Sequence, residues 1–81
     1  MVISIDFCGT QRSITRTDKI DISLFNRARV ADVLNLLRNM YPDLPLNEKT
    51  VTATVNLEIS SMDRVLEAND KVSFLPHIGG G

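Results

Sequence analysis

The sequence predicts a two-layer α+β domain in which one amphipathic helix covers a mixed sheet of four or five strands. Three observations lead to this fold class. Apolar and polar residues alternate in two segments near the N-terminus, apolar residues recur at helical spacing mid-chain, and alternation returns in the C-terminal third. Because 81 residues suffice for one domain, we expect a single domain over residues 1–81, with a flexible C-terminal tail at residues 76–81.

The first two strands are predicted from a period of two. Two alternating segments separated by a short connection favour an antiparallel hairpin. The polar stretch between them, residues 9–18, predicts a connecting loop or one irregular turn. Apolar side chains take every second position in the two segments: Ile3, Ile5, Phe7, Ile20, Ile22 and Leu24.

The main helix is predicted between residues 30 and 41. Its best N-cap candidate is Asn26, although a start nearer Arg29 also fits the pattern. Pro42 is expected to end it, because proline cannot donate the helical hydrogen bond and clashes with the preceding turn. The apolar residues at helical spacing are Val30, Val33, Leu34, Leu37, Met40 and Tyr41.

Three further strands are predicted in the C-terminal third. A third strand precedes a turn near Asn56, a short partner strand follows that turn, and Asn69-Asp70 marks a turn before the last strand. Pro76 is expected to end the last strand. In such a layout the first and last strands are expected side by side and parallel at the sheet centre. The apolar residues of these strands are Val51, Ala53, Val55, Leu57, Ile59, Val72 and Phe74.

Composition excludes several function classes. The net charge is -1, from 9 basic and 10 acidic residues, which gives no electrostatic drive toward nucleic acid or an anionic membrane. No apolar run is long enough to span a bilayer, and residues 1–7 do not read as a signal peptide. The single cysteine, Cys8, cannot form an intramolecular disulfide. A cytoplasmic location is the resulting expectation.

Residue types needed for catalysis are sparse. The chain has one histidine and one cysteine, and His77 and Cys8 have no spacing typical of a metal site. No phosphate-binding glycine motif and no nucleophile motif occurs. We therefore expect no metal, no bound cofactor and no active site of the chain's own, which leaves its status as an enzyme open.

The C-terminus is the unusual feature of the sequence. Gly79-Gly80-Gly81 carry no Cβ atoms, so they fit a narrow channel and could present the Gly81 carboxylate inside a partner enzyme. A carboxylate is a poor acyl donor until adenylation by ATP supplies a leaving group. Attack by sulfur on that anhydride would yield a thiocarboxylate. A plain flexible end is the alternative interpretation.

Residues 69–81, NDKVSFLPHIGGG, and the Val55-Asn56 pair resemble the molybdopterin synthase small subunit, MoaD, of the MoaD–ThiS sulfur-carrier family. The resemblance extends over essentially the whole chain. The residues that match the C-terminal signature of that family are Asp70, Val72, Phe74, Pro76, Ile78, Gly80 and Gly81. The chain departs from the family's usual residues at Arg29, Asn69, His77 and Gly79.

The resemblance implies a β-grasp fold, as in ubiquitin. It implies that a MoeB-like enzyme uses ATP to adenylate Gly81, that a sulfurtransferase system makes the thiocarboxylate, and that a MoaE-like large subunit accepts the tail for molybdopterin synthesis. Gly79 and Gly80 would form the slim part of the tail that the large subunit accepts. Partner docking is implied for Phe74, Leu75, Pro76, His77 and Ile78, although the strand period of Phe74 favours a place in the core.

Other functions stay open on the sequence. A carrier for thiamin or another thiolated product would use the same tail chemistry. A ubiquitin-like modifier would end in an isopeptide bond with a lysine. A plain interaction domain would have an inert tail, and only in that case would an extra residue after Gly81 leave function intact.

Overall fold

The order of helices and strands follows the predicted one, with one addition. The computed structural model describes residues 1–77 of the chain. The predicted mixed sheet has five strands, and a second, short helix lies near the N-terminus. In chain order the elements are β1 (Val2–Asp6), α1 (Thr10–Thr15), β2 (Lys19–Ser23), α2 (Val30–Met40), β3 (Val51–Val55), β4 (Glu58–Ser60) and β5 (Lys71–Pro76).

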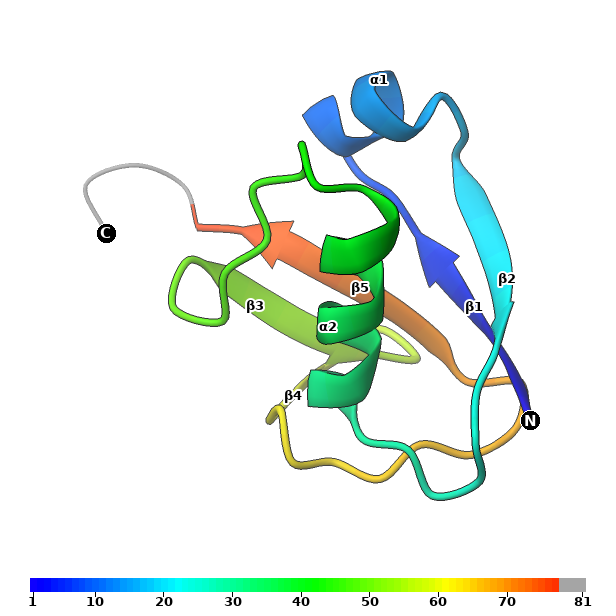
Figure 1. Ribbon diagram of the computed structural model, residues 1–81. Coiled ribbons are helices and arrows are strands. Elements are labelled where there is room, and N and C mark those ends of the chain that lie inside the picture. Colours follow the sequence, from blue (N-terminus) through cyan, green and yellow to red (C-terminus); the bar gives the residue numbers. More distant parts are fainter. Residues whose placement is uncertain (78–81) are drawn as a thin grey trace.

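The sheet has the order β2-β1-β5-β3-β4. The predicted parallel pair is confirmed: β1 and β5 lie side by side at its centre, while every other pair is antiparallel. Figure 1 shows α2 crossing one face of the sheet and no helix on the other, which we call the open face. Figure 1 also shows the start of β1 and the end of β5 at opposite ends of the sheet, because the two strands run the same way.

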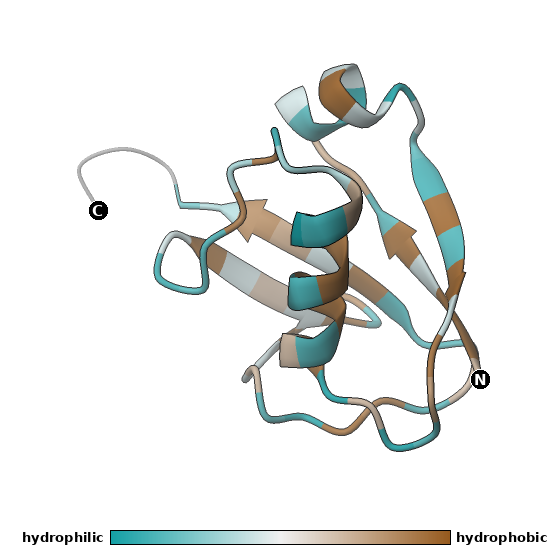
Figure 2. Ribbon diagram, in the orientation of Figure 1, coloured by the Kyte–Doolittle hydropathy of each residue, from teal (hydrophilic) through white to brown (hydrophobic). Residues whose placement is uncertain are grey.

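The core lies between α2 and the sheet. Figure 2 shows the apolar side of α2 turned toward the strands and its polar side turned outward. Burying these apolar side chains is the main favourable term for a domain of this size. The buried residues of α2 are Val30, Val33, Leu34 and Leu37, and those of β1, β3 and β5 include Ile3, Ile5, Val51, Ala53, Val55, Val72 and Phe74.

The start of α2 lies at the later of the two predicted positions. Arg29 is the N-cap, and its backbone N–H donates to the Asp32 carboxylate at 2.8 Å. Asn26 as N-cap is wrong, because the chain before the helix pairs with another segment: the Leu66 N–H donates to the Ala28 carbonyl at 2.8 Å. Ala28 is fully buried, and Arg29, which forms an isolated bridge with Val65, is still extended, so the helix begins only after it.

The short helix α1 is a correction to the sequence analysis, which predicted a loop or an irregular turn over residues 9–18. Periodicity of apolar residues could not reveal this helix, because its buried residue is the polar Gln11, which is 5% exposed. Its fixed position comes from hydrogen bonds of that side chain to Cys8 and Phe74.

Two predicted turns are confirmed by their backbone angles. Asn69 has φ 70°, in the left-handed region that asparagine tolerates. Asn56 and Leu57, between β3 and β4, have φ 52° and 73°. Positive φ at both central residues is the hallmark of the tight hairpin turns that match strand twist.

Candidate functional site

The candidate site is the C-terminal end of β5, from which the predicted tail continues. Its predicted chemical residues, Gly79, Gly80 and Gly81, lie outside the residues that the structure describes, as does Ile78. The geometry on view is therefore that of the tail root, a name we give to Leu75, Pro76 and His77.

On one side the tail root is bound to β3. Thr52 is the strand partner of Leu75, and Val51 is that of Pro76. His77 then adds two contacts: its N–H donates to the Thr50 carbonyl at 3.0 Å, and its ring Nε2 lies 2.9 Å from Thr52 Oγ1. A flexible tail beginning at residue 76 is thus wrong for its first two residues, because the β3–β5 ladder continues through them.

Pro76 can lie in this ladder without a missing hydrogen bond. In an antiparallel pair, successive residues point their N–H groups alternately toward and away from the partner strand. His77 donates toward β3, so the nitrogen of Pro76 faces away from β3, where no β3 acceptor is lost. Pro76 does end the strand as predicted.

On the other side Phe74, the residue before the tail root, is bound to α1. The Gln11 side chain donates from Nε2 to the Phe74 carbonyl at 2.7 Å, and its Oε1 accepts from the Cys8 N–H at 3.1 Å. The Cys8 thiol is half-buried, with Sγ 3.8 Å from the same Phe74 carbonyl. The last residues of β5 are thus contacted from both sides.

Alternation along β5 separates the predicted docking residues. Phe74 is 2% exposed and packs in the core, so the core interpretation holds and direct docking by its side chain is wrong. Leu75 is 40% exposed and points to the open face. Pro76 and His77 are exposed as well. The predicted docking residues that the structure leaves accessible are therefore Leu75, Pro76 and His77.

Two exposed apolar residues of the β3–β4 hairpin were not predicted as site residues. Leu57 is 87% exposed and Ile59 is 80% exposed. Ile59 pairs with Thr54 and Leu75 pairs with Thr52, so the two side chains lie on the open face on either side of β3. We call Leu57, Ile59 and Leu75 the open-face patch. Its sequence signal was available: Ile59 alternates with Glu58 and Ser60 in a short edge strand, which leaves it little to pack against.

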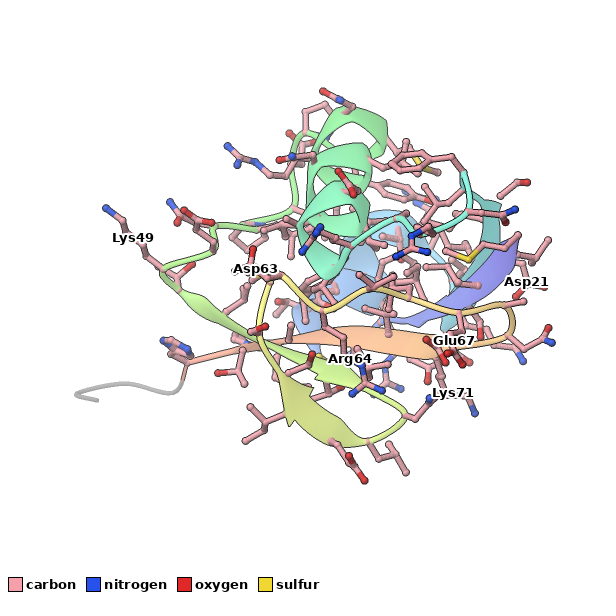
Figure 3. All side chains as sticks on the ribbon, turned by 90° about the horizontal axis from the view of Figure 1, so that it is seen from below. Asp21, Lys49, Asp63, Arg64, Glu67 and Lys71 are labelled. Carbon is pink, nitrogen blue, oxygen red and sulfur yellow. The ribbon has the colours of Figure 1, made fainter. Side chains whose placement is uncertain are left out.

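Figure 3 shows Lys49 extending into solvent at the end of the sheet where the tail begins, and Lys71 at the opposite end of β5. Across residues 1–77, no three His, Cys, Asp or Glu side chains gather in a way that could hold a metal ion. None of the helices in that range is long and apolar enough to cross a membrane.

Comparison with known proteins by sequence gives two matches. The model of the ThiS family matches residues 5–81. The molybdopterin synthase sulfur carrier subunit of Mycobacterium tuberculosis is 27% identical over 75 residues, which cover 93% of this chain and 90% of that protein. The family match therefore includes the terminal glycines.

Comparison by structure gives the same fold. The small archaeal modifier protein 1 of Methanosarcina acetivorans has a TM-score of 0.79 at 20% identity, over 99% of this chain and 96% of that one. A chain in a complex of subunits 1 and 2 of the molybdopterin-converting factor of Helicobacter pylori gives a TM-score of 0.61 at 18% identity. The match covers 100% of this chain and 100% of that one. These likenesses show the ubiquitin-like β-grasp fold. The chain therefore belongs to the ThiS family, the ubiquitin-like sulfur carriers.

Proposed function

We propose that this chain is the sulfur carrier subunit of a molybdopterin synthase and that the C-terminal carboxylate of Gly81 carries the sulfur atom. The observation that carries the proposal is the end of β5: an exposed strand terminus, held in register to His77, leads directly into Ile78 and three glycines. The near full-length similarity to the Mycobacterium tuberculosis sulfur carrier subunit supports the choice of pathway.

The proposed chemistry proceeds in two steps on the Gly81 carboxylate. A MoeB-like partner transfers AMP from ATP to that carboxylate and releases pyrophosphate. A sulfur nucleophile supplied by a sulfurtransferase then attacks the carbonyl carbon, AMP leaves, and a thiocarboxylate remains. The carrier supplies an accessible carboxylate and a slim tail, Gly79 and Gly80, and ATP is bound by the partner.

The open-face patch is the proposed docking surface for a MoaE-like large subunit. Leu57 is 87% exposed and Ile59 is 80% exposed, so burial of these two apolar side chains against a partner would stabilise a complex. Leu75 belongs both to this patch and to the tail root, so a partner that covers the patch would also reach Pro76 and His77. The likeness to a subunit of a two-subunit converting factor is consistent with such an assembly.

The test is the intact mass of the protein after incubation with ATP, hydrosulfide and a MoeB-like activating enzyme. We expect the mass to rise by the difference between sulfur and oxygen. A variant lacking Gly81 and a variant with one residue added after Gly81 should show no change. An unchanged wild-type mass with competent activating enzymes would refute the carrier proposal.

A second candidate is a ubiquitin-like protein modifier, favoured by the likeness to a small archaeal modifier protein. Both functions start with adenylation of Gly81, but a modifier ends in an isopeptide bond with a lysine. The thiocarboxylated protein should be mixed with a MoaE-like subunit and cyclic pyranopterin monophosphate. Formation of molybdopterin would favour the sulfur carrier of a molybdopterin synthase, and lysine conjugates in cell extract would favour the modifier. Activity in a thiamin assay instead would point to a sulfur carrier for thiamin.

A further inference from the structure

We propose that Gln11 and His77 form a clamp that fixes where the tail leaves the sheet, and that both are positioning residues for the reaction at Gly81. The inference rests on the proposed sulfur-carrier function. It concerns residues outside the reacting group: one lies in α1, and the other directly follows β5.

On the β1 side, Gln11 replaces a backbone hydrogen bond. The β1–β5 pair is regular from Ser4, whose N–H donates to the Asp70 carbonyl at 3.0 Å, up to the pair of Asp6 with Ser73. Continued regularly, the ladder would next join the N–H of Cys8 to the carbonyl of Phe74.

The Gln11 carboxamide is inserted between these two groups. Its Oε1 accepts from the Cys8 N–H at 3.1 Å and its Nε2 donates to the Phe74 carbonyl at 2.7 Å. The side chain is 5% exposed, so it is a fixed spacer and not a surface contact. It satisfies both backbone groups while it holds β1 and the end of β5 apart.

On the β3 side, His77 extends the ladder by a single backbone bond. The Thr50 carbonyl accepts from the His77 N–H, but the Thr50 N–H is already used by the Asn47 carbonyl at 2.9 Å, so the usual second bond cannot form. The contact between the His77 ring and the Thr52 hydroxyl, 2.9 Å, takes its place. A hydroxyl can donate or accept, so this contact is compatible with either neutral tautomer of the ring and with its protonated form.

The clamp determines how much chain remains free to enter a partner. Fully extended, residues 78–81 would span about 13 Å. Because Leu75, Pro76 and His77 are ordered before binding, the partner does not have to order them. Loss of the clamp should therefore raise the KM for the carrier in adenylation and leave kcat nearly unchanged, since the reacting carboxylate is the same.

The experiment compares Thr52→Val, Gln11→Met and His77→Ala with the wild-type chain. The matched control is Thr54→Val, on the same strand and the same face but without a contact to His77. We expect KM to rise about 2- to 10-fold in the three clamp variants, with kcat within about twofold. His77→Gln, whose amide can still reach the Thr52 hydroxyl, should restore a KM near that of the wild type.

Amide hydrogen exchange of the isolated carrier tests the clamp independently of any partner. The His77 N–H should exchange about 2- to 10-fold faster in Thr52→Val than in Thr54→Val. Equal exchange in these two variants would overturn the clamp. Faster exchange with an unchanged KM in every clamp variant would overturn its positioning role. If the wild-type chain is never adenylated, the proposed function fails, and the exchange comparison alone decides whether the clamp exists.

Discussion

Among single residues, Asp70 is a buried polar group whose side chain links two turns. It is 9% exposed, and its two carboxylate oxygens accept from the Glu67 N–H at 2.8 Å and from the Asn56 side-chain amide at 3.0 Å. Asn56 in turn accepts from the Lys71 N–H at 3.0 Å. One carboxylate therefore joins the turn before β5 to the turn after β3.

Replacing this carboxylate should be costly because it leaves donors without acceptors. We expect Asp70→Ala to lower the free energy of unfolding by about 2 kcal/mol, measured by urea denaturation. The control is Asp63→Ala, at an exposed carboxylate visible in Figure 3, which should change stability by less than about 0.5 kcal/mol. Equal effects of the two substitutions would contradict the role given to Asp70.

At the scale of elements, the hairpin of β3 and β4 combines strain with exposure. Leu57 adopts φ 73°, a conformation that side chains with a Cβ atom disfavour, yet its side chain is 87% exposed and gains little from packing. Glycine would fit the turn better. Strain that buys no internal packing is typical of a functional position, here the proposed docking patch.

Leu57→Gly should therefore act in opposite directions on folding and on binding. We expect the free energy of unfolding to rise by about 1 kcal/mol, and the affinity for a MoaE-like subunit, measured by calorimetry, to fall by about tenfold. Ile59→Thr, at an exposed position in β4 without positive φ, should weaken binding without the gain in stability. A stabilised Leu57→Gly variant that binds as tightly as the wild type would remove Leu57 from the docking surface.

For the molecule as a whole, stability rests on a small core. A domain of 81 residues buries a modest share of its surface, so each large buried side chain accounts for a sizeable part of a net stability of only several kcal/mol. Leu37, which is 1% exposed on α2, is one of these side chains.

Truncation in the core should accordingly approach the limit of what the fold tolerates. We expect Leu37→Ala to cost about 3 kcal/mol and to lower Tm by more than about 10 °C in a thermal scan. Met40→Ala, one turn further along the same helix and 45% exposed, should cost less than about 1 kcal/mol. If the two substitutions had similar effects, the assignment of the buried face of α2 would be wrong.

The sequence allowed the order of the main elements to be predicted because their burial is periodic. Alternation such as Ile3–Ile5 marks a half-buried strand, and the spacing of Val30, Val33 and Leu37 marks a helix. The helix α1 escaped prediction because its anchor, Gln11, is polar and one of its two partners, Phe74, lies far away in the chain. The hydrogen bond between His77 and Thr50 was not predicted either, because no local sequence pattern indicates a contact between residues so far apart in the chain.

The parallel pairing of β1 and β5 also determines where a tag can be attached to the protein. Because β1 begins at one end of the sheet and β5 finishes at the other, a purification handle or a sensor surface attached to Met1 would lie at the end of the sheet opposite His77. The Met1 amino group donates to the Leu24 carbonyl at 2.8 Å, and an amide N–H in a fusion could make the same bond. On the proposed function, tethering through Met1 therefore leaves the Gly81 carboxylate available for adenylation, whereas a C-terminal tag would convert that carboxylate into an amide.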